Sequence, residues 1–178
     1  MNYAKSLKKI AVNLPSGEKL SFQVGEYSEL QKSIIEEFLP RYGHGAEVLS
    51  VGNATDESLF LNKKKLEELN FFDPTSNELP DIIAFSKNKN WLYLIETVYG
   101  LGIINEIRLL QLKKMTINCK AEIIYVTAFN HREDFRKITA AIAWETDVWI
   151  ANEPDHLIHF NGDKFLGPYR TFINETIN

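Results

Sequence analysis

The chain has 178 residues, of which 44% are hydrophobic and 12% aromatic, and its formal net charge at pH 7 is −4. This composition is typical of a folded globular protein and excludes a disordered chain, and the length predicts one domain, residues 1–178. A single cysteine, Cys119, excludes an internal disulfide framework and a cysteine-based metal site. No apolar run reaches the roughly 18 residues of a spanning helix, and Met1 to Lys9 does not lead into a signal peptide. We therefore expect a cytoplasmic protein.

The first elements predicted along the chain are a hairpin and a helix. Lys9 to Leu14 and Lys19 to Val24 alternate in polarity around a turn, which predicts two antiparallel strands. A capping box at Ser28 and an apolar stripe predict a helix that ends at Pro40. Gln31 lies within that stripe and Glu37 at its edge, so both could support a buried site. The alternative is a boundary glutamine and a solvated glutamate.

The most informative segment is a pair of apolar runs, residues 79–85 and 91–98, which predict adjacent antiparallel strands in the interior of a sheet. Each run contains one carboxylate, Asp81 or Glu96. A turn centred on Asn88-Lys89 would place the two carboxylates opposite each other on one face, with Cβ atoms roughly 5 Å apart, whereas a turn one residue longer would put them on different faces. Two like charges in an apolar setting indicate a divalent cation. The alternative is that Asp81 caps the strand and Glu96 pairs with a basic residue.

The second half of the chain alternates between helices and strands. Asn105 predicts the start of a helix through Met115, with Ile107, Leu109, Leu110 and Leu112 buried, and residues 121–129 form an apolar strand. A helix between two such strands predicts a parallel crossover. The other predicted elements are strands at 46–51, 147–151 and 157–160, helices at 63–69 and 130–143, and a turn at Asn161-Gly162. This order predicts an α/β domain with a mixed central sheet flanked by helices and extra N-terminal and C-terminal hairpins.

Several stretches in this order resemble a known family. They include Leu79-Pro80-Asp81, Leu94-Ile95-Glu96, Tyr125-Val126-Thr127-Ala128-Phe129, Ile142-Ala143-Trp144-Glu145-Thr146 and Glu153-Pro154-Asp155-His156. Over nearly its whole length the chain resembles the catalytic region of the BsuBI/PstI restriction endonucleases, within the PD-(D/E)XK nuclease superfamily. The resemblance implies a single nuclease-like domain with a restriction-endonuclease-like core. It also implies a Mg²⁺-dependent type II endonuclease that cleaves double-stranded DNA as a homodimer.

The resemblance also implies site roles. Asp81, Glu96 and the backbone carbonyl of Thr97 would bind Mg²⁺, because hard cations prefer oxygen ligands. The superfamily's lysine, two positions after the glutamate, is Val98 here, and Arg108 is the best candidate to supply the missing positive charge in catalysis. The alternative for Arg108 is a surface residue paired with Glu106 or solvent.

The expected DNA contacts are less defined. Arg132, Arg136 and Lys137 form a candidate basic edge for DNA, as do Lys63 to Lys65, although each set is equally consistent with a solvated surface. The net charge argues against strong non-specific binding. The family's enzymes have a further N-terminal region, so we expect little sequence preference unless a separate recognition subunit supplies it. An altered loop between Tyr99 and Asn105 leaves one alternative function, an inactive nuclease-fold module that binds DNA or protein.

Overall fold

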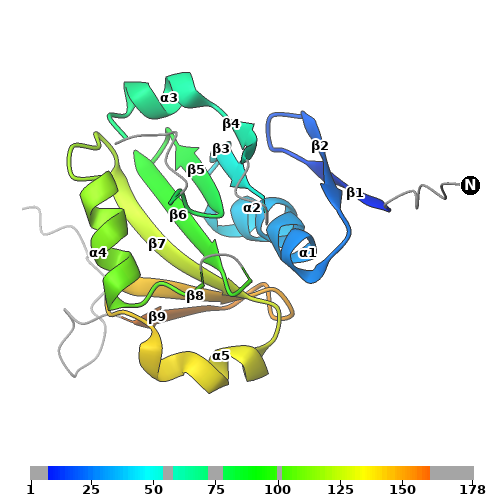
Figure 1. Ribbon diagram of the computed structural model, residues 1–178. Coiled ribbons are helices and arrows are strands. Elements are labelled where there is room, and N and C mark those ends of the chain that lie inside the picture. The colour runs from blue at the N-terminus through cyan, green and yellow to red at the C-terminus, as the bar shows by residue number, and fades with distance from the viewer. Residues whose placement is uncertain (1–7, 54–57, 72–77, 100–101, 161–178) are drawn as a thin grey trace, which may run out of the picture.

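A computed structural model describes residues 8–53, 58–71, 78–99 and 102–160. A small hairpin, β1 (Lys9–Asn13) and β2 (Lys19–Gln23), precedes a seven-stranded sheet (Figure 1). The sheet strands are β3 (Glu47–Gly52), β4 (Ser58–Leu61), β5 (Ile82–Ser86), β6 (Trp91–Thr97), β7 (Glu122–Phe129), β8 (Thr146–Ile150) and β9 (Leu157–Phe160). The N-terminal hairpin is thus confirmed, whereas β4 was not predicted and the turn at Asn161-Gly162 lies outside the described residues.

The sheet is mixed, with the strand order β4-β3-β5-β6-β7-β8-β9. Strand β6 pairs antiparallel with β5 and parallel with β7, so the two apolar strands lie in its centre. The β5–β6 pairs run from Ile82 opposite Ile95 to Ser86 opposite Trp91, which is the register predicted from a turn centred on Asn88-Lys89. The parallel crossover through the helix after β6 is also confirmed.

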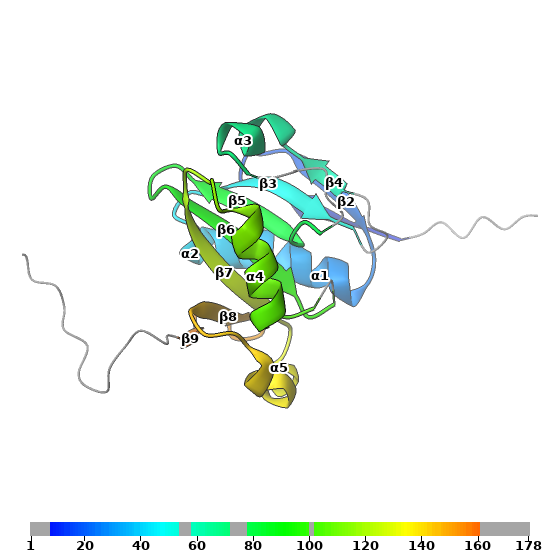
Figure 2. The same cartoon turned by 60° about the vertical axis from the view of Figure 1, so that its left-hand side comes forward.

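Helices cover both faces of the sheet, as Figure 2 shows. One face carries α1 (Glu26–Ser33), the π-helical turn η1 (Ile34–Phe38) and α2 (Leu39–Tyr42), and the other carries α4 (Glu106–Met115). The remaining helical segments are α3 (Lys63–Glu68), α5 (Arg132–Ile138) and the 3-10 turn η2 (Thr139–Ala141). Alternate residues of β6 follow this division, because Tyr93 and Ile95 pack in the core under α1 and Leu92 and Leu94 in the core under α4.

The predicted end of the first helix at Pro40 is wrong. The helix begins at Glu26, without a side-chain cap, and the helical path continues to Tyr42. In the widened turn η1 the Leu39 N–H donates to the carbonyl of Ile34, five residues back. Pro40 is the second residue of α2, so the helical path passes through a proline directly after the widened turn.

Helix α4 differs from its prediction in what it buries. Its cap at Asn105 is confirmed, because the Asn105 side chain accepts a hydrogen bond from the Arg108 N–H. Leu109 and Leu112 are buried as expected, but the side chains of Ile107 and Leu110 are 70% and 60% exposed. Among the described helices, none is both long and apolar enough to cross a membrane.

Candidate nuclease site

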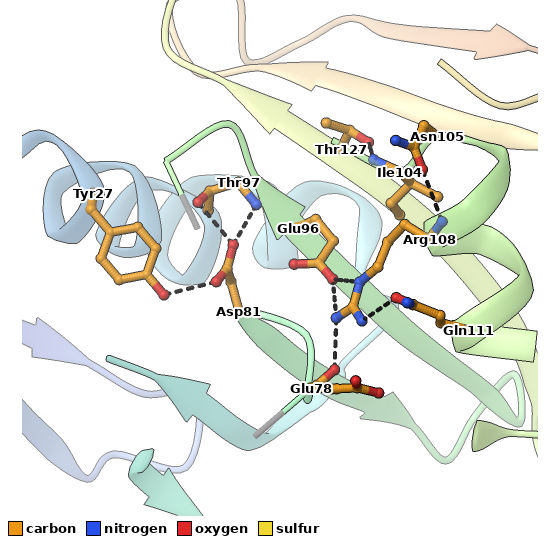
Figure 3. Close-up of polar contacts among 10 residues, drawn as sticks. All are labelled: Tyr27, Glu78, Asp81, Glu96, Thr97, Ile104, Asn105, Arg108, Gln111 and Thr127. Carbon is orange, nitrogen blue, oxygen red and sulfur yellow. Dashed lines mark hydrogen bonds and ion pairs between the residues drawn. The ribbon is translucent and has the colours of Figure 1, made fainter. Parts of the chain in front are cut away.

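The candidate site lies where β5 begins and β6 ends (Figure 3). Asp81 occupies the bend immediately before β5, and Glu96 and Thr97 are the last two residues of β6. All three side chains are almost fully buried, as is Arg108 from α4, which is 7% exposed. The central antiparallel pair and one helix on the sheet therefore bring four of the predicted site residues together.

The Asp81 carboxylate accepts three hydrogen bonds. Its Oδ2 accepts from the backbone N–H of Thr97 at 2.7 Å and from the Thr97 hydroxyl at 2.9 Å. Its Oδ1 accepts from the Tyr27 hydroxyl of α1 at 2.8 Å. Burial raises the pKa of Asp81, and the hydrogen bonds from Thr97 and Tyr27 oppose that rise. These donors hold the carboxylate in one orientation at the end of β6.

The Glu96 carboxylate forms a buried ion pair with Arg108. The Nε and Nη2 atoms of Arg108 lie 2.6 and 2.5 Å from the same oxygen, Oε1. The other oxygen, Oε2, is buried and accepts no hydrogen bond from the described part of the chain. In Figure 3 this oxygen points toward the side on which Asp81 lies. Burial and the nearby Asp81 charge raise the pKa of Glu96 to about 8 despite the opposing effect of Arg108.

Arg108 itself is oriented by several backbone and side-chain contacts. Its Nη2 donates to the carbonyl of Glu78 at 2.7 Å, and its Nη1 donates to Gln111 Oε1 at 3.2 Å. The start of α4 is fixed against β7, because the Ile104 N–H donates to the Thr127 hydroxyl at 3.1 Å. The guanidinium is therefore held inside the protein, facing Glu96.

The two carboxylates are held from different sides of the sheet. Glu96 is paired with α4, on the face that carries Leu92 and Leu94. The partners of Asp81 are Tyr27 of α1 and Thr97, which follows Tyr93 and Ile95 on the opposite face. The predicted β5–β6 register is confirmed. Asp81 precedes the regular strand, however, and its partner Tyr27 lies on the opposite face of the sheet from Arg108, the partner of Glu96. That both carboxylates reach one cation stays a prediction.

The carboxylate oxygens of the site fit a hard divalent cation that has few protein ligands. Mg²⁺ retains several waters and is commonly held by one or two carboxylates. A buried carboxylate oxygen without a donor, Glu96 Oε2, is an atom that a hydrated cation would satisfy. Within the described residues no group of three or more His, Cys, Asp or Glu side chains could hold a metal, so a site rich in protein ligands is not formed there.

Of the other predicted site residues, Gln31 lies beside Asp81 and Glu37 does not. Gln31 is fully buried beside Asp81, with its Nε2 2.9 Å from the Gly52 carbonyl and 3.5 Å from the Asp81 carbonyl. Glu37 is not brought to the site, because its side chain is half exposed and pairs with Arg41. Val98 packs between two apolar clusters.

The candidate DNA-binding residues lie on α5. Arg132 pairs with Glu153 and Lys137 with Asp134, whereas Arg136 is exposed. Helix α5 follows β7, and β7 runs parallel to β6, so α5 begins at the edge of the sheet where Thr97 ends β6 (Figure 1). Their role in DNA binding stays a prediction.

Tyr27 is the contact that the sequence did not indicate. It lies four residues before Gln31, so the two side chains share one face of α1. Its hydroxyl reaches Asp81 across 54 positions of the chain. The spacing to Gln31 was the one available signal, and it does not by itself select a tyrosine as a partner of a carboxylate.

Both the sequence and the fold are similar to those of known proteins. Residues 10–163 match the family described as the BsuBI/PstI restriction endonuclease domain. The chain is 39% identical over 169 residues to the type II restriction enzyme BsuBI of Bacillus subtilis, covering 94% of this chain and 54% of that enzyme. It is 30% identical over 166 residues to the type II restriction enzyme AplI of Arthrospira platensis, covering 89% and 51%.

A solved structure of the SdaI restriction endonuclease superposes with a TM-score of 0.81 and 37% sequence identity, covering 92% of this chain and 51% of that one. The expected restriction-endonuclease-like core is thereby confirmed. The chain spans about half the length of each relative that it matches.

Proposed function

The chain belongs to the BsuBI/PstI restriction endonuclease family, and from this membership we propose that it is a Mg²⁺-dependent type II endonuclease that hydrolyses phosphodiester bonds of double-stranded DNA. The observation that carries the proposal is the buried pair of carboxylates, Asp81 and Glu96, with Arg108 held against one of them. Shifted pKa values of buried acidic groups cluster at functional sites, and structural ion pairs such as Glu96 with Arg108 shift them as well, so the assay below decides between the two.

Hydrolysis of a phosphodiester requires a positioned water, relief of the negative charge that develops on the phosphate, and a proton for the leaving oxygen. Bound Mg²⁺ supplies a Lewis acid and lowers the pKa of a coordinated water. Asp81, Glu96 and the Thr97 carbonyl are the groups proposed to hold it. Arg108 fixes the Glu96 carboxylate through Oε1 and leaves Oε2 available.

Arg108 is also the proposed substitute for the superfamily's lysine. Val98 occupies the lysine position, where it is partly buried against two apolar clusters, and its side chain carries no charge. The positively charged guanidinium reaches the Glu96 carboxylate from α4. It would therefore offset the negative charge of the site from a different element of the fold.

Duplex DNA is the proposed substrate and partner, with α5 as its contact surface. Arg136 and its neighbours Arg132 and Lys137 would bind phosphates, which position a duplex without reading its sequence. A separate recognition subunit is proposed as a further partner, because a net charge of −4 argues against strong DNA binding by these residues alone. The cytoplasmic location belongs to the same proposal.

A homodimer is proposed because two strands must be cut, and α4 offers a surface for it. Ile107 and Leu110 expose an apolar strip on this helix. Glu106 at its start and Lys114 near its end are both exposed. Two copies packed antiparallel about Leu110 would place each Glu106 opposite the other copy's Lys114.

A plasmid-nicking assay tests the proposed activity and separates it from an inactive binding module. The full chain should convert supercoiled plasmid to nicked and linear forms with Mg²⁺ or Mn²⁺ and not with a chelator. Asp81→Asn and Glu96→Gln should each abolish cleavage while retaining the far-UV circular dichroism of the folded protein. DNA binding without metal-dependent cleavage by the unmodified chain would contradict the endonuclease and support the binding module.

A further inference from the structure

Helix α1 reaches the site from the face of the sheet opposite to Arg108. Its Tyr27 hydroxyl donates to Asp81 Oδ1 at 2.8 Å, and one turn later the Gln31 amide donates to the Gly52 carbonyl at 2.9 Å. A Cβ added at Gly52 would lie 3.5 Å from the Tyr27 hydroxyl and 3.6 Å from the Asp81 carbonyl. The phenol hydroxyl therefore lies close to the Gly52 backbone as well as to Asp81.

The orientation of both side chains follows from their partners. The Tyr27 hydroxyl faces Oδ1 of a carboxylate, which can only accept a hydrogen bond, so the phenol acts as the donor. Gln31 faces two carbonyl oxygens, those of Gly52 and Asp81, so only its NH₂ group can point toward them. Tyr27 thus contacts the carboxylate of Asp81 while Gln31 lies against its backbone.

The contact to Tyr27 differs in kind from the contacts to Thr97. The two Thr97 donors bind Oδ2 and come from the strand next to Asp81, so they fix one oxygen. Oδ1 has Tyr27 as its donor. Because the two oxygens turn together about the Cβ–Cγ bond, the Tyr27 contact to Oδ1 and the Thr97 contacts to Oδ2 jointly restrain the rotation of the carboxylate. A carboxylate that binds a cation gains affinity when it is held in one orientation before the cation arrives.

We propose that Tyr27 is a positioning residue for the metal-binding carboxylate of Asp81, acting from α1 through its hydroxyl. The inference rests on the proposed metal-dependent nuclease function. Tyr27 itself does not bind the cation or the scissile phosphate. Its effect is on the affinity for the cation, through the orientation of Asp81.

The matched control is Tyr93, whose hydroxyl also makes a partly buried hydrogen bond. The Tyr93 hydroxyl donates to the Tyr42 carbonyl at 2.8 Å, in the core under α1, and contacts neither carboxylate of the site. Tyr27→Phe and Tyr93→Phe each remove one phenol hydrogen bond of equal length. Both should lower the melting temperature by a similar amount, so a difference in metal binding between them reports on position rather than on general stability.

The test is a calorimetric titration of the full chain with Mn²⁺, without DNA. Tyr27→Phe should weaken Mn²⁺ binding about 10-fold or more, as expected for loss of a group that orients a ligand, while Tyr93→Phe should bind as the unmodified chain does. In cleavage assays Tyr27→Phe should need a correspondingly higher Mg²⁺ concentration for half-maximal rate. Equal Mn²⁺ affinity in Tyr27→Phe and the unmodified chain would overturn the proposal.

A second variant covers the case in which Tyr27→Phe does not fold. Thr97→Val removes another hydroxyl that donates to Asp81 and should also weaken Mn²⁺ binding. If Tyr27→Phe fails to fold and Thr97→Val binds Mn²⁺ normally, hydrogen bonds to Asp81 do not set affinity and the proposal is overturned. Absence of Mn²⁺ binding by the unmodified chain would overturn the proposed metal site itself, a result distinguishable from equal binding by both proteins.

Discussion

Replacing Arg108 by methionine would remove the positive member of the one ion pair in the described residues with both side chains buried. The Arg108 and Glu96 side chains are 8% and 0% exposed, and their closest atoms are 2.5 Å apart. Removing one partner of such a pair leaves an uncompensated buried charge, which destabilises a protein by about 3–5 kcal/mol. The substitution also removes the donor to the Glu78 carbonyl. We expect Arg108→Met to lower the free energy of unfolding by an amount that approaches this range above about pH 8, where the Glu96 carboxyl, whose pKa is about 8, loses its proton.

Arg132 supplies a control with the same separation but a different environment. It lies 2.5 Å from Glu153, with side chains 57% and 36% exposed. Exposed pairs contribute about 0–1 kcal/mol, so Arg132→Met should change stability little. The double variant Arg108→Met, Glu96→Gln removes both buried charges and should recover most of the loss. Urea unfolding followed by circular dichroism, without divalent ions, measures all three.

The loss in Arg108→Met should depend on pH with a defined sign. The pKa of Glu96 is already raised to about 8 from 4.5, and removal of Arg108 raises it further. A group with a raised pKa in the folded state contributes stability that is present below its unfolded pKa and is lost as pH rises through the folded pKa. The deficit should therefore be larger at about pH 9 than at about pH 5. A deficit equal to that of Arg132→Met, or one independent of pH, would refute the reasoning.

Other predictions concern the metal, DNA and a second copy of the chain. Saturating Mn²⁺ should raise the melting temperature of the unmodified chain, because a ligand at 100 times its Kd stabilises by about 2.7 kcal/mol, and should not do so for Asp81→Asn. Arg136→Ala with Lys137→Ala should weaken binding to unrelated duplexes equally and reduce the slope of log affinity against log salt by about 2; a loss confined to one sequence would contradict a phosphate-binding role. Leu110→Glu should abolish a concentration-dependent dimer in sedimentation experiments, and a dimer of unchanged strength would exclude the α4 surface.

The central strands and their register could be predicted because their signals are local. The two-residue alternation of β5 and β6 and the turn at Asn88-Lys89 determine which residues oppose each other, and the cap at Asn105 determines where α4 begins. Arg108 could be suggested as a site residue because Val98 stands where the PD-(D/E)XK superfamily has a lysine. Its burial against Glu96 required the packing of α4 onto the sheet.

The contacts that were missed depend on tertiary packing. No periodicity links Tyr27 to Asp81, which is 54 positions away. The exposure of Ile107 and Leu110 was missed because α4 carries apolar residues on more than one face, and composition alone does not say which face meets the sheet. An ideal α-helical wheel puts Glu37 at the edge of the apolar stripe. Glu37 lies within η1, however, where the helical turn is wider.

The widened turn η1 fixes the rotation of α1 relative to α2. Each residue of an α-helix advances the side-chain direction by about 100°. One residue more or fewer between Ser33 and Leu39 would therefore turn Tyr27 and Gln31 away from Asp81 or turn the buried Leu39 out of the core. Removing a single residue from η1 would thus change the rotation of α1 relative to α2 by about 100°. Every side chain of the site would be retained.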